Sequence, residues 1–84
     1  MMKSKQLDIV LRERKRVLFK GAAKSLSSVN NLGKFDILYN HANFVTTVKE
    51  MIILTHNRGY ERKFKIGSGI LSAEENKVEV FVGV

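Results

Sequence analysis

The sequence predicts an all-β fold, either a sandwich or a barrel. Turn-forming residues recur about every 8–12 positions, a spacing typical of sandwiches and barrels rather than of alternating strands and helices. Between these turns, apolar and polar residues alternate as they do in strands with one buried face, most clearly over residues 60–66 and 78–82. No segment after residue 20 shows the periodicity of an amphipathic helix.

The first twenty residues fit two interpretations. Alternation around Leu7 predicts strands, but several apolar residues of this segment would also share one face of a basic helix. Ile9, Val10, Val17 and Phe19 are residue types that favour strands. We therefore expect two strands here, joined by a turn over residues 12–16 that lacks Gly, Asn and Asp.

The strands expected after residue 20 are separated by turn-forming residues. Asn30–Gly33 ends one strand, Asn57–Gly59 is the clearest hairpin signal, and Glu75-Asn76 marks the last turn. Gly67–Gly69 is expected to break the chain between two strands, because glycine weakens a strand interior.

The stretch from Asn30 to Thr47 combines two short apolar strands with a polar bend between them. His41 lies at the apex of this bend, between Asn40 and Asn43, and Phe44 starts the next strand. Loops on rigid scaffolds often carry function, so this bend is a candidate contact site. The simpler interpretation of His41 is a solvated or locally hydrogen-bonded loop residue.

Length and composition predict one small folded domain over residues 1–84, with an ordinary hydrophobic content of 44%. The absence of cysteine excludes disulfides, thiol chemistry and Cys-based zinc sites. The two histidines, His41 and His56, have no carboxylate close to them in the sequence, so no metal site is expected. The longest apolar run, Met51–Leu54, is too short to span a bilayer, and no secretory signal is apparent. A soluble, cytoplasmic protein is expected.

Motifs typical of enzymes are absent from the sequence. There is no GxxxxGK[ST], GxGxxG, HExxH or GxSxG. Gly67–Gly69 precedes no expected helix, which favours a bulge or turn over a phosphate-binding loop. No serine has a sequence reason to meet a histidine, so no nucleophile–base pair can be nominated. We therefore predict a protein that is not an enzyme and needs no cofactor.

Basic residues are concentrated near the N-terminus. Through Lys24 the chain carries eight Lys and Arg against two acidic residues, whereas the remainder carries seven against six. A solvated rim is the simplest interpretation, but such a segment could also meet phosphate, anionic lipid or an acidic protein. The alternative function is therefore a small basic nucleic-acid-binding β-barrel, although only Phe19 lies near this segment to stack on bases. Lipid binding would require the first twenty residues to be helical.

Several segments, in order, resemble the N-terminal β-sandwich domain of the ATP synthase epsilon subunit family, whose mitochondrial member is called delta. The resemblance covers the whole chain and rests on LDIV (7–10), FKG (19–21), KSLSSVNN (24–31), GKF (33–35), YNHANFVT (39–46) and GSGILSAEENKVEVFV (67–82).

This resemblance implies a flattened β-sandwich of about ten short, mostly antiparallel strands, with no C-terminal helical hairpin in this chain. It implies a non-catalytic central-stalk subunit that links the gamma subunit to the membrane c-ring and couples proton-driven rotation to ATP synthesis. Such a subunit would lie at the cytoplasmic face of the plasma membrane, held there through the complex, and no nucleic acid would be a partner.

The resemblance also implies which residues face these partners. They are Asn31, Gly33, Lys34, Phe35, Asn40, His41 and Ala42. Two departures stand out. Lys34 occupies a position where the family usually has an acid that faces the c-ring, and a like-charge contact there would be costly. The prolines that flank the family's Gly-His-Ala segment are replaced by Tyr39 and Asn43, so the bend is expected to be less rigid.

Overall fold

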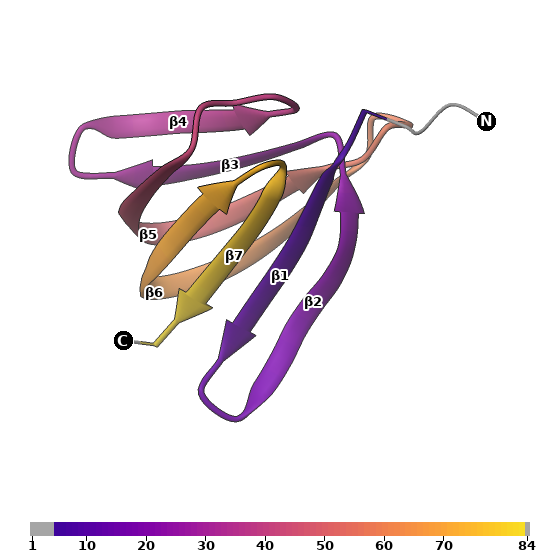
Figure 1. Ribbon diagram of the computed structural model, residues 1–84. Coiled ribbons are helices and arrows are strands. Elements are labelled where there is room, and N and C mark those ends of the chain that lie inside the picture. The colour runs from indigo at the N-terminus through magenta and orange to yellow at the C-terminus, as the bar shows by residue number, and fades with distance from the viewer. Residues whose placement is uncertain (1–4, 84) are drawn as a thin grey trace.

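The computed structural model describes residues 5–83, which form seven strands in one sheet and no helix (Figure 1). Two strands are expected within the first twenty residues, and Met1–Ser4 of that segment lie outside the described residues. The strands are β1 (Leu7–Glu13), β2 (Arg16–Ala23), β3 (Ser25–Asn30), β4 (Gly33–Leu38), β5 (Phe44–Thr55), β6 (Glu61–Glu74) and β7 (Lys77–Val82). Their order in the sheet is β2-β1-β7-β6-β5-β3-β4, and only the β1–β7 pair is parallel.

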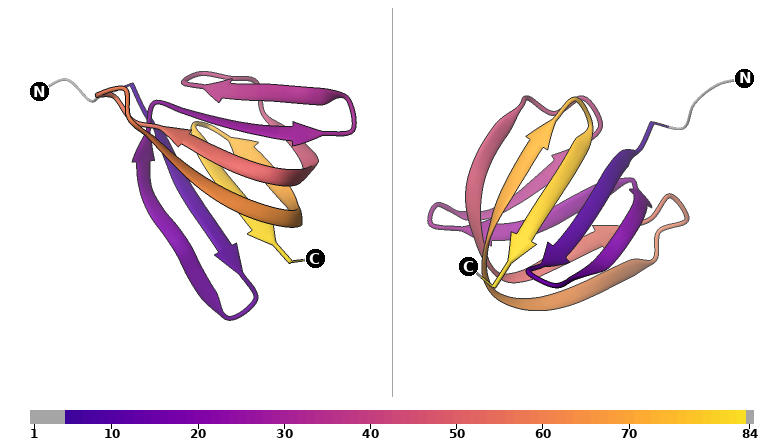
Figure 2. Two further views of the ribbon diagram at one scale, coloured as in Figure 1. Left: turned by 180° about the vertical axis from the view of Figure 1, so that it is seen from behind. Right: turned by 60° about the horizontal axis from the view of Figure 1, so that its bottom comes forward.

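The sheet folds over on itself to make the two layers of a sandwich (Figure 2). The fold occurs in the two longest strands, β5 with 12 residues and β6 with 14. Their register shifts between Lys49 and Glu50, and Glu50 adopts a positive φ of 72°. Such a bulge sharpens the local twist and bends the strand. One layer holds β4, β3, the second half of β5 and the first half of β6; the other holds β2, β1, β7 and the remaining halves.

The predicted all-β sandwich is thus confirmed, but the number of strands is seven rather than about ten. The expectation that Gly67–Gly69 ends one strand and starts another is wrong, but the expected bulge is confirmed, because Gly67 has no partner in β5 between Ile66 and Ser68. Ser68 and Gly69 stay paired with Lys49 and Val48 of β5, so β6 bends here without stopping. Glycine tolerates this curvature because it has no side chain that must fit either face.

The N-terminal segment forms the two predicted strands and not a helix. Arg14 and Lys15 make a two-residue turn between Glu13 and Arg16, whose side chains form an ion pair at 2.6 Å. A register shift between Leu11 and Arg12 increases the local twist, which lets the hairpin close without a turn-forming residue.

A single core fills the space between the two layers. Its members come from alternate positions of every strand: Leu7, Ile9, Leu11, Ala23, Leu26, Ile37, Val48, Ile52, Leu54, Leu71, Ala73, Val78, Val80 and Val82. The Asn30–Gly33 and Glu75-Asn76 turns form as expected. Ala22, however, is exposed and Ala23 buried, since the chain bends at Lys24 before β3 begins.

Candidate functional site

The residues expected to face partners fall into two groups at opposite ends of β4. Asn31 belongs to the turn between β3 and β4 and Gly33 and Lys34 begin β4, whereas Asn40–Ala42 belong to the loop that follows β4. The remainder of β4, Phe35–Leu38, separates the two groups, so they lie on the order of 15–20 Å apart along the strand. The structure therefore presents two separate surfaces rather than one site, with Phe35 between them.

The β3–β4 turn is held in one conformation by Asn30. Its Oδ1 accepts a hydrogen bond from the backbone N–H of Leu32 at 2.9 Å, and its Nδ2 donates to Thr46 Oγ1 at 3.2 Å. Gly33 has a φ of 118°, a conformation that glycine adopts without strain. As a result the turn projects Leu32, which is 97% exposed, next to the exposed Lys34.

The loop of residues 39–43, here called the His41 loop, is fastened to the β6–β7 turn. The backbone N–H of Asn40 donates to Asn76 Oδ1 at 2.6 Å, and Asn76 Nδ2 donates to Asn40 Oδ1 at 3.3 Å. The backbone N–H of Glu75 donates to Asn43 Oδ1 at 3.0 Å. Asn40 therefore has a structural role, because these bonds hold the His41 loop to the β6–β7 turn.

His41 is exposed at the tip of this loop. Its backbone N–H donates to the Leu38 carbonyl at 3.0 Å. Its ring Nδ1 lies 2.9 Å from the Ala42 carbonyl oxygen, which can only accept, so Nδ1 is the donor in this contact.

An aromatic row joins the His41 loop to the middle of β4. The rings of His41 and Phe44 lie 5.1 Å apart, and Phe44 makes an edge contact with Phe35 at 6.1 Å. Phe44 is thus a member of this surface that the sequence did not single out. Its only signal was its place at the start of a strand three residues after His41.

A second aromatic cluster lies where β2 meets the β5–β6 hairpin. Arg62 stacks over Phe19 at 5.4 Å and over Phe64 at 5.1 Å, while His56 stacks on Tyr60 at 4.4 Å. Phe19 and Phe64 contact each other and the core. Most of these rings are therefore packed together, which does not favour the row of open rings on which bases stack.

Two serine side chains of β3 bond to groups other than a histidine. Ser27 Oγ donates to Asp36 Oδ1 at 2.6 Å, and Ser28 Oγ donates to the Met51 carbonyl at 2.7 Å. No group of three or more His, Asp or Glu side chains in this part of the chain could hold a metal ion. Across the same residues, no helix is long and apolar enough to cross a bilayer.

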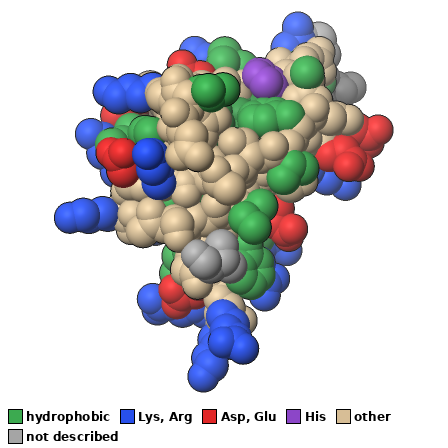
Figure 3. Space-filling model, turned by 90° about the vertical axis from the view of Figure 1, so that its left-hand side faces the viewer, with side chains coloured by type: hydrophobic (Ala, Val, Ile, Leu, Met, Phe, Trp, Pro, Cys, Tyr) green, Lys and Arg blue, Asp and Glu red, His purple; other side chains and the backbone are tan. Residues whose placement is uncertain are grey.

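Charged side chains cover much of the surface. Figure 3 shows Lys and Arg around the rim of one face, hydrophobic side chains between them, and a basic projection at the lower end. That projection is the β1–β2 turn, at the bottom of Figure 1, which carries Arg14, Lys15 and Arg16. This distribution suits contact with other molecules.

Comparisons with known proteins agree with this architecture. The family model described as the beta-sandwich domain of the ATP synthase Delta/Epsilon chain matches residues 4–84. The chain is 37% identical over 65 residues to the ATP synthase epsilon chain of Clostridium botulinum (strain Alaska E43 / Type E3), covering 76% of this chain and 48% of the relative. For the epsilon chain of Clostridium novyi (strain NT), identity is 33% over 81 residues, covering 95% and 60%. The chain thus spans about half the length of the curated relatives it matches.

Two solved structures share the fold. A chain of the Euglena gracilis mitochondrial ATP synthase, in the OSCP/F1/c-ring structure in rotational state 1, matches with a TM-score of 0.87 at 15% identity, covering 94% of this chain and 51% of that one. A chain of the Tetrahymena thermophila mitochondrial ATP synthase central stalk/c-ring matches with a TM-score of 0.74 at 12% identity, covering 100% and 67%. The family match over nearly the whole sequence confirms the resemblance: the chain belongs to the ATP synthase delta/epsilon family, as its β-sandwich domain.

Proposed function

We propose that the chain is a non-catalytic central-stalk subunit of an F-type ATP synthase. In this role it links the gamma subunit to the membrane c-ring, at the cytoplasmic face of the plasma membrane, and helps to couple proton-driven rotation to ATP synthesis. The family match over residues 4–84 is the observation that carries the proposal.

The geometry around β4 supports a linking role. A subunit that joins two partners needs two contact surfaces on one rigid body. The β3–β4 turn and the His41 loop are separated by the length of β4 and lie on the same sheet edge. Both are fixed by side-chain hydrogen bonds, from Asn30 in the first and from Asn43 and Asn76 in the second. A subunit that transmits rotation between two partners needs contact segments that keep their conformation under load.

Lys34 defines what the partner at the β3–β4 turn can be. It is exposed beside the fully exposed Leu32. A basic partner loop opposite Lys34 would be repelled, so we infer a partner loop that is neutral or acidic and offers an apolar contact to Leu32.

Co-purification tests the proposed function. A tagged copy of the chain, expressed in its native cell, should recover the gamma subunit and the catalytic subunits of the synthase in stoichiometric amounts after mild detergent extraction. Changing His41→Ala together with Phe44→Ala should reduce this recovery, whereas Lys20→Glu, an exposed change on the distant β2 edge, should not. The proposal would be contradicted if the tagged wild-type chain were recovered without other synthase subunits from cells whose synthase remains assembled.

A further inference from the structure

The first half of β6 has a free edge. Glu61–Ile66 pairs with β5 on one side, but β7 pairs with β6 only from Gly69 onward. Within residues 5–83 no other strand pairs with this half of β6. Strand β2 lies near this half of β6, because the rings of Phe19 and Phe64 are 6.1 Å apart. However, β2 is the edge strand at one end of the sheet, and its backbone does not pair with β6. Backbone N–H and C=O groups of an unpaired edge are available to another strand.

A groove runs along this edge. It consists of two adjoining hollows of about 550 and 470 Å³ that share the residues from Lys63 to Gly67. Leu18, Phe64, Ile66 and Val82 line its apolar face, whereas Met51, the cross-strand neighbour of Lys65, lies on the lysine face. Leu18, Phe64 and Ile66 are only partly buried although they pack against the core. The groove therefore exposes apolar surface that a bound segment could cover.

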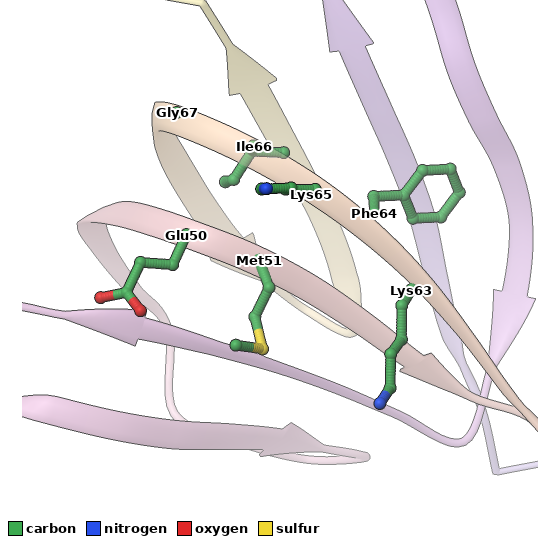
Figure 4. A pocket seen from close by; sticks show the side chains of 7 residues that line it. All are labelled: Glu50, Met51, Lys63, Phe64, Lys65, Ile66 and Gly67. Carbon is green, nitrogen blue, oxygen red and sulfur yellow. The ribbon is translucent and has the colours of Figure 1, made fainter.

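The rim of the groove is charged: Lys63 and Lys65 are basic, Glu50 is acidic, and Arg16 is paired with Glu13. Lys63 and Lys65 alternate with Phe64 and Ile66 along β6, and Lys63 leaves the strand in a direction opposite to Phe64 (Figure 4). A strand has this alternation because successive side chains point to opposite faces. The edge thus offers lysines on one face and apolar side chains on the other, with Glu50 near one end of the groove.

We propose that the free edge of β6 binds an extended segment of another protein in which carboxylate and apolar residues alternate. Added beside β6, such a segment would complete the backbone hydrogen bonds of Glu61–Gly67. Its carboxylates would lie beside Lys63 and Lys65, and its apolar side chains would cover Phe64 and Ile66. A second copy of the chain is a poor occupant, because two molecules of net charge +7 repel each other.

This partner surface is distinct from the two contact surfaces proposed for the stalk. Strands β5 and β3 separate β6 from β4 in the sheet. The inference therefore stands or fails independently of the stalk function and can be tested on the isolated chain.

The probe is a disulfide-closed β-hairpin peptide whose free strand alternates glutamate and valine. A preformed strand loses less conformational entropy on binding than a flexible peptide. NMR titration at physiological ionic strength should show saturable shifts in β6, and hydrogen exchange of free-edge amides within Glu61–Gly67 should slow by about tenfold or more at saturation. No comparable slowing is expected in β4, which is also an edge strand.

Charge reversal tests the proposed pairing. Lys63→Glu with Lys65→Glu should weaken binding of the glutamate peptide by about tenfold, because two attractions become repulsions. The same variant should gain affinity for a peptide with lysine in place of glutamate. Lys5→Glu with Lys77→Glu makes an equal change in net charge away from the groove, so it should bind the glutamate peptide nearly as the wild type does. Unfolding midpoints check that each variant is folded.

Three results would overturn the proposal. The first is no saturable binding of the glutamate peptide, or binding that protects β2 or β4 instead of β6. The second is binding that the Lys63 and Lys65 reversals leave unchanged. The third is protection of the same β6 amides by self-association, or by vesicles of anionic lipid, with affinity above that of the peptide.

Discussion

At the scale of single residues, asparagines fix the surfaces that face outward. Asn40 and Asn76 both adopt positive φ, 63° and 66°, which asparagine tolerates better than most residues. Their side chains then bond each other's loops, 36 positions apart in the sequence. The position of His41 therefore depends on a residue in a distant turn.

Substitutions at Asn76 can distinguish two contributions to stability, namely the side-chain hydrogen bonds of Asn76 and its positive φ. Asn76→Gly keeps the positive φ without strain but removes both bonds to Asn40, so it should lower the free energy of unfolding by about 1 kcal/mol. Glu75→Gly, with a φ of 49° in the same turn, is the matched control and should be neutral or slightly stabilising. Urea unfolding measures both, and the His41 amide should shift only in Asn76→Gly. Equal destabilisation by the two changes would contradict the role given to Asn76.

At the scale of elements, the bend in β5 and β6 decides the architecture. Alternation of apolar residues made the strands themselves predictable, as Val78 and Val80 show. The bulge at Gly67 was predicted, since a glycine inside a strand pattern often marks one, but the positive φ of Glu50 opposite it was not, because glutamate has no preference for that conformation. Reading alternation over short segments therefore divides each of the long bent strands, β5 and β6, into two, so that four strands are expected where the structure has two. The parallel pairing of β1 with β7 joins opposite ends of the chain and follows from core packing alone.

In the candidate site, likewise, features that depend on neighbouring residues were predicted, whereas those that depend on contacts between distant residues were not. The turn at Gly33 and the bend at His41 are local signals, and both were predicted. Phe44 and Asn76 were not, since an aromatic residue that starts a strand and an asparagine in a turn each have an ordinary explanation. Their roles depend on contacts that only the folded chain makes.

The close approach of the β6 and β7 backbones at Gly69 gives a test at this scale. A Cβ on Gly69 would lie 2.6 Å from the Phe81 carbonyl oxygen, whereas a Cβ on Gly67 would meet nothing within 4 Å. Gly69→Ala should therefore lower the free energy of unfolding by about 1–3 kcal/mol, because the two backbones must move apart. Gly67→Ala should change it by less than about 0.5 kcal/mol or raise it slightly. Chemical denaturation compares them, and a loss of similar size in both variants would show that the bend, not the close approach, needs glycine.

At the scale of the whole molecule, unbalanced charge opposes folding. The net charge is +7, and Arg16–Glu13 is the one side-chain ion pair found within residues 5–83. Repulsion among the remaining cations is stronger in the compact state than in the unfolded chain. Partners with acidic surfaces would relieve it.

Salt should therefore stabilise the isolated chain. Raising NaCl from about 10 to about 150 mM shortens the screening length from about 30 to about 8 Å, so the thermal midpoint should rise by a few degrees. A variant with Arg14→Gln and Lys15→Gln removes two exposed charges and should show a smaller rise. Differential scanning calorimetry decides this, and a midpoint that falls with salt would mean that attraction outweighs repulsion.

Site-specific crosslinking in the assembled synthase tests the central claim most directly. The chain has no cysteine, so Leu32→Cys and His41→Cys each introduce a unique thiol at one end of β4. Oxidation or a short thiol-to-amine crosslinker should join each variant to a stalk or c-ring subunit, while Arg58→Cys, in the remote β5–β6 turn, should remain unlinked. The account predicts both products in one complex. Crosslinks from Arg58→Cys alone, or no product from either end of β4 in an intact synthase, would contradict it.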